Sequence, residues 1–222
     1  ATVSINVKGI SGVISSDTTW TLANSPYLVT DNVLVEDGVT LTIEAGVVVK
    51  FSSGLYIKNK GIITAIGTSS NKITFQSNAD SPAKSDWVGI KIRSSGGSVI
   101  DGSQNYSSGS QFKYVVIKHA DVGLYIYNAG LHVSYAEFDT NKYGVEIRKT
   151  DGIVIDNSTF TGNNAGVWSL EEANTGDSVS IISNTYITNN TFSNNSNGID
   201  LMTNQRDFKN LNITKNIFTG NN

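Results

Sequence analysis

The sequence predicts an all-β fold, a single right-handed parallel β-helix with three short strands in each coil. A glycine followed by alternating apolar residues recurs at intervals of 21, 22 and 32 residues, a period typical of solenoids of stacked strands. Short β-branched and aromatic runs, separated by Gly, Asn, Asp and Ser, predict strands along most of the chain. Helical periodicity is confined to segments too short to stand alone. The glycine-led copies begin at Gly123, Gly144, Gly166 and Gly198, with weaker copies at Gly54 and Gly89.

Each copy ends on a phenylalanine followed three positions later by an asparagine. Equivalent residues of successive coils lie about 4.8 Å apart, so the phenylalanines predict a stack of rings inside the solenoid, which Ile117 continues one coil earlier. The asparagines predict a ladder at one corner, in which each amide bonds to the coils above and below. The leading glycines are expected at corners where φ is positive or backbones crowd. The two columns are Phe138, Phe160, Phe192 and Phe218, and Asn141, Asn163, Asn195 and Asn221.

The chain is predicted to be one domain whose first part differs from the rest. Residues 1–46 are less regular and contain Trp20 and Tyr27. They are expected to form an N-terminal cap and the first coil, because a solenoid needs its first coil shielded. Residues 47–222 are predicted to form the coils. The last repeat stops where another strand is due, so the chain is expected to be part of a longer protein. Three polar stretches are predicted to be loops beside the strands and candidate specificity elements: residues 77–86, 94–110 and 170–177.

Composition excludes several classes of partner. The chain has 16 Lys and Arg against 19 Asp and Glu, which argues against nucleic-acid binding because that requires a basic face. No apolar run approaches the roughly 18 residues of a membrane span, so no membrane insertion is expected. There is no cysteine, and the two histidines, His119 and His132, are predicted to be isolated and solvated, which argues against a zinc or copper site. No cofactor is predicted; calcium on loop oxygens near Asp101, Asp151 or Asp177 is an open alternative.

The early coils carry a recognisable pattern in Trp20-Thr21-Leu22, in the run from Val39 to Phe51 and in Trp87-Val88-Gly89-Ile90. These stretches resemble the opening coils of bacterial and archaeal cell-surface proteins with right-handed parallel β-helix repeats, in the pectate-lyase-like superfamily. The later coils are similar to the periplasmic copper-processing (NosD-like) repeats. The resemblance covers nearly the whole chain and implies the fold and an extracellular or cell-surface location. It leaves activity open, since the superfamily includes lyases, glycoside hydrolases, tailspikes, adhesins and noncatalytic modules.

Aligning the glycines places two columns of outward side chains on one sheet. Their mixture of aromatic, cationic and acidic groups suits a polysaccharide or cell-surface glycan, because aromatic faces stack on sugar rings and charges bind hydroxyls or uronates. The alternative is a solvated sheet, since Tyr and Trp are good strand formers. The predicted ligand-binding residues are Tyr56, Lys91, Tyr125, Glu146, Trp168 and Asp200 in the first column, and Arg93, Tyr127 and Arg148 in the second, which also holds Lys58, Leu170 and Met202.

Three functions are compatible with this surface. The preferred hypothesis is a noncatalytic extracellular module of a larger cell-surface protein, used for carbohydrate binding or adhesion. The second is a polysaccharide lyase or glycoside hydrolase, or a fragment of one, with Glu146 and Asp200 as candidate catalytic carboxylates. Two coils separate their backbones by about 9 to 10 Å, near the upper limit of the roughly 6.5–9.5 Å between the carboxyls of inverting glycosidases. The third is a purely structural spacer.

Overall fold

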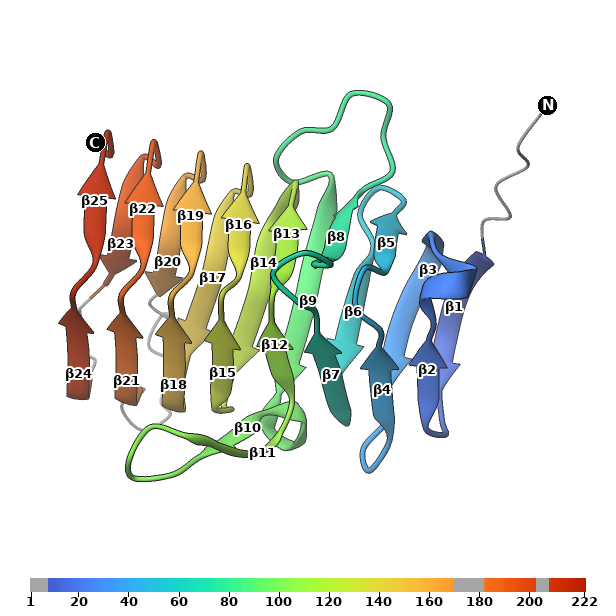
Figure 1. Cartoon of the computed structure of the whole chain (residues 1–222), viewed down its shortest axis with the longest axis horizontal. Helices are drawn as coiled ribbons and strands as arrows, with labels where there is room; N and C mark the ends of the chain where they lie inside the picture. Colours follow the sequence, from blue (N-terminus) through green and yellow to red (C-terminus); the bar gives the residue numbers. More distant parts are fainter. Residues whose placement is uncertain (1–7, 170–181, 203–207) are drawn as a thin grey trace, which may run out of the picture.

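The computed structural model describes residues 8–169, 182–202 and 208–222, and in them the chain winds into the predicted parallel β-helix (Figure 1). Each complete coil lays down three strands, and each strand pairs in parallel with its equivalent in the next coil. The coils follow one another along the long axis of the molecule, from the N-terminal to the C-terminal end. The solenoid therefore has three strand-lined faces.

One face carries the predicted binding residues and is called the site face. Its strands neighbour one another in the order β6, β9, β14, β17, β20 and β23. Their bounds are β6 (Tyr56–Asn59), β9 (Trp87–Arg93), β14 (Ala120–Tyr127), β17 (Tyr143–Arg148), β20 (Ala165–Ser169) and β23 (Asn197–Leu201).

The second face joins the site face through β3 (Tyr27–Val35). The first half of β3 pairs with β5 of the second face, and its second half pairs with β6 of the site face. The third face is a separate sheet. The second face comprises β5 (Val48–Phe51), β8 (Ile73–Ser77), β13 (Val115–Lys118), β16 (Glu137–Asp139), β19 (Thr159–Thr161), β22 (Thr191–Ser193) and β25 (Ile217–Thr219). The third comprises β2 (Thr18–Trp20), β4 (Thr40–Ile43), β7 (Ile62–Ile66), β12 (Gln111–Lys113), β15 (Leu131–Ser134), β18 (Asp151–Asp156), β21 (Ile182–Thr188) and β24 (Phe208–Thr214).

Two additions break the repeat. Near the N-terminus, β1 (Lys8–Ile14) pairs in parallel with β3, and a 3₁₀ turn η1 (Leu22–Asn24) follows β2. Between β9 and β12, a short turn η2 (Ser94–Gly96) leads into an antiparallel hairpin of β10 (Ser98–Ile100) and β11 (Tyr106–Gly109). The stretch 94–110, predicted to be a loop, thus has its own strands. The predicted loop 170–177 lies outside the described residues.

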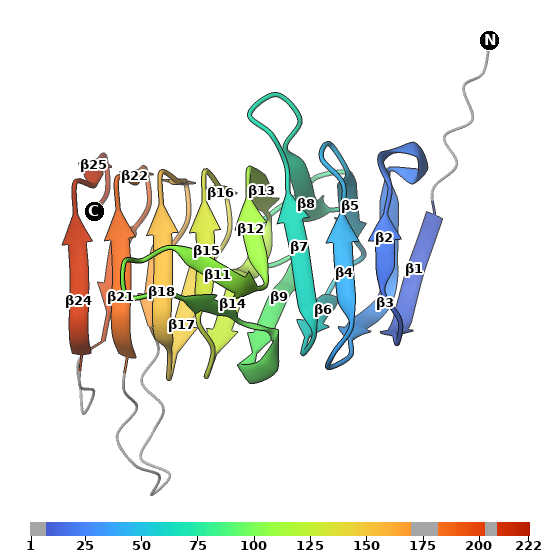
Figure 2. The ribbon, with the colours of Figure 1, turned by 60° about the horizontal axis from the view of Figure 1, so that its bottom comes forward.

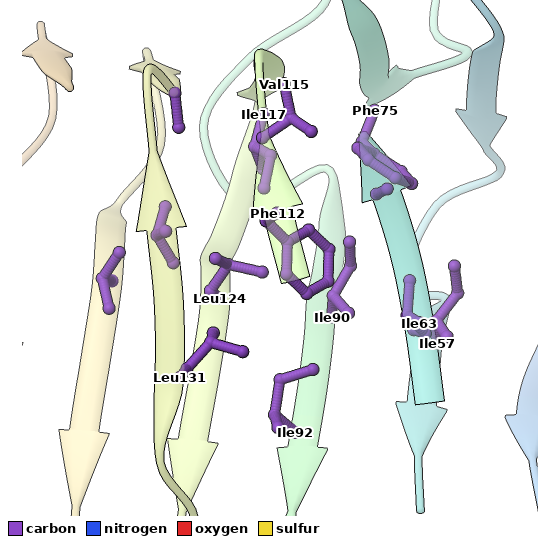
Figure 3. Packing of buried hydrophobic residues seen from close by; sticks show 14 of the residues in the cluster. Ile57, Ile63, Phe75, Ile90, Ile92, Phe112, Val115, Ile117, Leu124 and Leu131 are labelled. Atoms are coloured by element: carbon purple, nitrogen blue, oxygen red, sulfur yellow. The ribbon is translucent and has the colours of Figure 1, made fainter. Parts of the chain in front are cut away.

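The core is a continuous column of apolar side chains enclosed by the three faces. Inward positions alternate with outward ones along each strand, and the inward residues form one buried cluster from Trp20 to Phe192. Figure 3 shows Phe112, Ile117 and Leu124, from three successive strands, in the enclosed space. Every coil contributes inward residues from its three strands. These residues are buried by packing against the equivalent residues of the neighbouring coils, so no coil has a separate core.

The predicted phenylalanine column is confirmed. Phe160 stacks on Phe138 and on Phe192 with ring centroids 4.7 Å apart in both pairs, and Phe218 continues the stack 5.0 Å from Phe192. Ile117 occupies the same register one coil earlier, as predicted. The spacing of the rings is that of neighbouring strands in a sheet, so each coil adds one ring to the stack.

The predicted asparagine ladder is also confirmed. The side-chain Oδ1 of Asn163 accepts hydrogen bonds from the backbone N–H and the side-chain amide of Asn141, at 2.9 and 3.1 Å. The Nδ2 of Asn163 donates to the backbone carbonyl of Phe138 and to Oδ1 of Asn195, at 3.0 and 2.9 Å. The same pattern links Asn195 to Asn221. The ladder satisfies buried backbone groups at a corner where no sheet partner is available.

A second polar ladder was not predicted. Oδ1 of Asn190 accepts from the backbone N–H of Ser158, and Oδ1 of Asn216 accepts from the backbone N–H of Asn190, both at 2.9 Å. The three residues each stand two positions before a stacked phenylalanine. This constant offset from the phenylalanines could have predicted the second ladder from the sequence, although Ser158 stands where the other two coils have asparagine.

The repeat glycines are explained by crowding rather than by positive φ. Gly123, Gly144, Gly166 and Gly198 have no positive φ. A Cβ built on Gly166 would lie 2.5 Å from the carbonyl oxygen of Gly198 and 2.6 Å from Cδ1 of Phe192. The glycine therefore makes room for the backbone and the phenylalanine ring of the next coil.

Replacing Gly166 by alanine is expected to destabilise the protein by about 1–3 kcal/mol, because the neighbouring backbone must shift to accept the methyl group. Thermal unfolding followed by circular dichroism measures the effect. Gly102→Ala is the matched control, since a Cβ there meets nothing within 4 Å. Equal melting temperatures for the two variants would contradict the crowding explanation.

Candidate functional site

Most of the two predicted columns are aligned on the site face. Lys91, Tyr125, Glu146, Trp168 and Asp200 are direct neighbours across successive strands. In the second column, Tyr127 pairs with Arg93 on one side and with Arg148 on the other. The prediction that Leu170 and Met202 continue this column is not tested, because residue 170 lies outside the described residues.

The predicted register of the first coil is wrong by two residues. Tyr56 pairs with Gly89, and Lys58 rather than Tyr56 pairs with Lys91. The error comes from treating Gly54 and Gly89 as equivalent. Gly54 precedes β6 in a turn, with φ of 72°, whereas Gly89 lies within β9.

Aromatic rings hold the cations of the site in place. The Nζ of Lys91 lies 4.1 Å from the centroid of the Tyr56 ring, so Tyr56 joins the cluster despite the shifted register. The guanidinium carbon of Arg93 lies 4.9 Å from the Tyr125 ring and 5.0 Å from the Tyr127 ring. The negative face of each ring attracts the cation that lies over it and so stabilises the position of that cation.

The charges of the cluster divide into paired and unpaired groups. Arg148 forms an ion pair with Glu146, and Asp121 accepts from Lys142 at 3.2 Å, which raises the pKa of Lys142 through that hydrogen bond. Among the described residues, neither Lys91 nor Arg93 has a carboxylate partner within 4 Å. Lys91 and Arg93 therefore lack a salt-bridge partner in the described part of the chain, although the charge of Asp121 acts on Lys91 from a longer distance.

Partial burial perturbs the titrating groups beside these charges. Desolvation lowers the pKa of Lys91, and the positive charges of Arg93 and Lys58 lower it further. Desolvation likewise raises the pKa of Tyr125, so its hydroxyl stays protonated at neutral pH. An anion bound beside Lys91 would favour its charged form and reverse part of the shift.

These side chains surround a hollow of about 300 Å³, called the cationic hollow. This volume lies at the lower end of the roughly 300–1,000 Å³ typical of ligand sites. Sequence reasoning missed Asp121, which stands two positions before Gly123 and outside both columns. The hollow is lined by Val88, Lys91, Arg93, Asp121, Val122, Tyr125, Glu146 and Arg148.

The two candidate catalytic carboxylates lie in different environments. Glu146 is 2% exposed and paired with Arg148, whereas Asp200 is half-buried and accepts from the side-chain amide of Asn197 at 3.0 Å. Trp168, between them in the column, is 8% exposed and stacks on Tyr143 with centroids 3.9 Å apart. An acid and base acting on one glycosidic bond must both reach it, and this arrangement supplies an ion pair at one position and a hydrogen-bonded carboxylate at the other. Catalysis by the pair stays a prediction.

The histidines are less solvated than predicted. The side chain of His132 is 15% exposed, lies 3.6 Å from a carboxylate oxygen of Asp156 and faces the ring of Tyr106. Burial lowers the pKa of His119. The prediction failed for His132 because the inserted hairpin, which brings Tyr106, covers it.

The described residues contain no cluster of three or more His, Asp or Glu side chains able to hold a metal ion. Of the three aspartates considered for calcium, Asp101 accepts from the backbone N–H groups of Ser103 and Asn105. Asp151 accepts from Ser183, and Asp177 lies outside the described residues. Within the part of the chain that is described, no helix has the length and hydropathy needed to cross a membrane.

Comparison with known proteins links this geometry to one class of fold. Residues 12–136 match the family model of the pectate-lyase-like β-helix domain, and residues 106–222 match that of the right-handed β-helix region. The chain is also similar to Protein bark beetle of Drosophila melanogaster, with 36% identity over 69 residues. That stretch is 31% of this chain and 2% of that protein, so the chain spans a small part of the relative's length. No solved structure matches the chain.

Proposed function

The chain belongs to the pectate-lyase-like, right-handed β-helix proteins, and from that premise we propose that it is a noncatalytic, extracellular or cell-surface module that binds an acidic glycan. The matched families describe a fold and leave function to the surface. The proposed binding surface is the cationic hollow together with Tyr56 and Tyr127. Adhesion to a glycan-coated surface is the role such a module would serve within a larger protein.

The pair of unmatched cations, Lys91 and Arg93, is the observation that carries this proposal. Two half-buried positive charges without a carboxylate partner among the described residues favour an anion between them. The guanidinium carbons of Arg93 and Arg148 lie over the ring of Tyr125, 4.9 and 5.3 Å from its centroid, so an aromatic ring adjoins the charges. A uronate or sulfated sugar supplies both an anionic group and an apolar ring face.

The test is binding of polygalacturonate, alginate and heparan sulfate to the wild-type chain and to a K91A/R93A variant. Binding of at least one of these polymers is expected, and the double variant should lose at least about tenfold in affinity, since a charge-assisted hydrogen bond contributes about 1.5–3 kcal/mol. Affinity should also fall as salt rises, because screening weakens exposed charge pairs.

The matched control is K60A/K209A, which removes two exposed lysines from outside the hollow and gives the same change in net charge. Equal losses in both double variants would indicate nonspecific attraction and contradict the proposed site. Absence of binding to all three polymers would favour the structural spacer. Appearance of unsaturated or reducing sugar ends during incubation would instead favour an enzyme.

A further inference from the structure

The inserted hairpin builds a second cleft on the third face, away from the cationic hollow. Figure 2 shows the hairpin of β10 and β11 crossing in front of β15 and β18. Its base is tied down, because the N–H of Ser98 donates to the carbonyl of Gly130 at 2.8 Å and Ser98 Oγ accepts from the N–H of His132 at 3.0 Å. The ring of Tyr106 lies over the His132 ring, with centroids 6.3 Å apart. The hairpin is therefore a fixed wall.

Beside this wall lies a hollow of about 460 Å³, called the hairpin cleft. Its volume is within the range typical of ligand sites. One side is formed by Ile100 and Asp101 of the hairpin, and the other by Asp151, Asn184, Tyr186 and Asn210 from β18, β21 and β24. The cleft therefore runs across three successive coils.

The polar groups of the cleft form an ordered row. The side-chain amide of Asn210 donates to Oδ1 of Asn184 at 2.8 Å, and the amide of Asn184 donates to Oδ1 of Asp151 at 2.7 Å. Each bond uses one of the two hydrogens on the donating nitrogen. The row thus holds its side chains in place and keeps both donor and acceptor capacity for a ligand, which is the combination that sugar hydroxyls match.

The charge of this cleft is opposite to that of the cationic hollow. Its lining contains two carboxylates, Asp101 and Asp151, and no Lys, Arg or His among the described residues. Carboxylates accept hydrogen bonds from hydroxyls and repel anions. Tyr186 adds an amphipathic ring, with an apolar face for stacking and a hydroxyl for hydrogen bonding.

We propose that the hairpin cleft is a second binding site, specific for neutral oligosaccharides. The tied hairpin supplies a preformed wall, the row from Asp151 to Asn210 binds hydroxyls, and Tyr186 stacks on a sugar ring. Because the two sites use different faces and opposite charge, this site stands whether or not the cationic hollow binds an acidic glycan. The chain would then hold two chemically distinct glycans on separate faces.

The test is calorimetric titration of the full chain with cellohexaose, xylohexaose, mannohexaose and laminarihexaose. At least one is expected to bind with a Kd below about 1 mM. Tyr186→Ala should weaken that binding by about 3- to 10-fold through loss of ring contact. Asn184→Asp should weaken it too, since it replaces the amide that donates to Asp151 with a second carboxylate and so disrupts the row. Aspartate tolerates the positive φ of 47° at this position, so this variant tests the site even if Tyr186→Ala folds poorly.

Asn164→Ala, at an exposed position outside both hollows, is the control and should bind the neutral hexasaccharide as the wild-type chain does. K91A/R93A tests the location of the sugar, since loss of neutral binding in that variant would place the sugar in the cationic hollow and overturn the proposal. Binding that survives both Tyr186→Ala and Asn184→Asp would overturn it as well, as would failure of all four hexasaccharides to bind. A loss confined to the cleft variants supports it.

Discussion

Replacing Asn163 by alanine is expected to destabilise the protein by about 3–5 kcal/mol. The amide of Asn163 makes four hydrogen bonds, to the backbone and side chain of Asn141, to the carbonyl of Phe138 and to Asn195. Alanine leaves these buried groups unpaired, and each unsatisfied group costs about 1–3 kcal/mol, not additively. For a chain of this length the melting temperature should fall by about 10 °C, measured by circular dichroism.

The matched control for the ladder is Asn164→Ala, one residue along the same chain. Asn164 is exposed, and its side chain accepts from the exposed Lys84 at 2.9 Å. Its loss is expected to change stability by no more than about 0.5 kcal/mol. If both variants melt together, the ladder contributes little, and the buried polar corner must be satisfied in another way.

Replacing Phe160 by alanine is expected to cost about 3–5 kcal/mol, the range for truncating a buried phenylalanine. Phe160 is fully buried and stacks on both Phe138 and Phe192. Its removal leaves a cavity that the rigid strands of neighbouring coils cannot close. Denaturant unfolding followed by tryptophan fluorescence measures the loss, with hydrogen exchange of nearby amides reporting whether the damage stays local.

Phe218→Ala provides a comparison within the same column. Within the described ranges Phe218 stacks on one ring, that of Phe192, and it is 51% exposed. Its truncation should cost clearly less than that of Phe160, at about 1 kcal/mol, because part of the ring is already in water. Similar losses at the two positions would show that burial along the column does not control stability.

Most of the fold could be predicted because a solenoid repeats its contacts. Phe160 contacts its equivalents one coil away, so the same residue type recurs at the same position in the sequence. The pairing of Lys91 with Tyr125, and onward to Asp200, followed from that periodicity. The prediction failed where the repeat is irregular, at Tyr56, because a turn glycine and a strand glycine look alike in sequence.

The candidate site could be predicted only in outline. The columns identified which side chains face outward, but the pairing of Arg148 with Glu146 and the approach of Asp121 to Lys142 depend on side-chain conformation. Because of these pairs, Lys91 and Arg93 are left without a carboxylate partner within 4 Å among the described residues. The near-complete burial of Glu146 likewise gave no signal in the strand pattern, where it alternates as an outward residue.

Periodicity alone established the architecture, the stacked phenylalanines and the Asn141-to-Asn221 ladder, because those contacts join identical positions of successive coils. Tertiary structure decided the charge balance of the cationic hollow and the position of the hairpin across β15 and β18. Those contacts join residues of unlike type at irregular separations in the chain, such as Tyr106 with His132 and Ser98 with Gly130. A repeat pattern carries no information about such contacts, since each is made once.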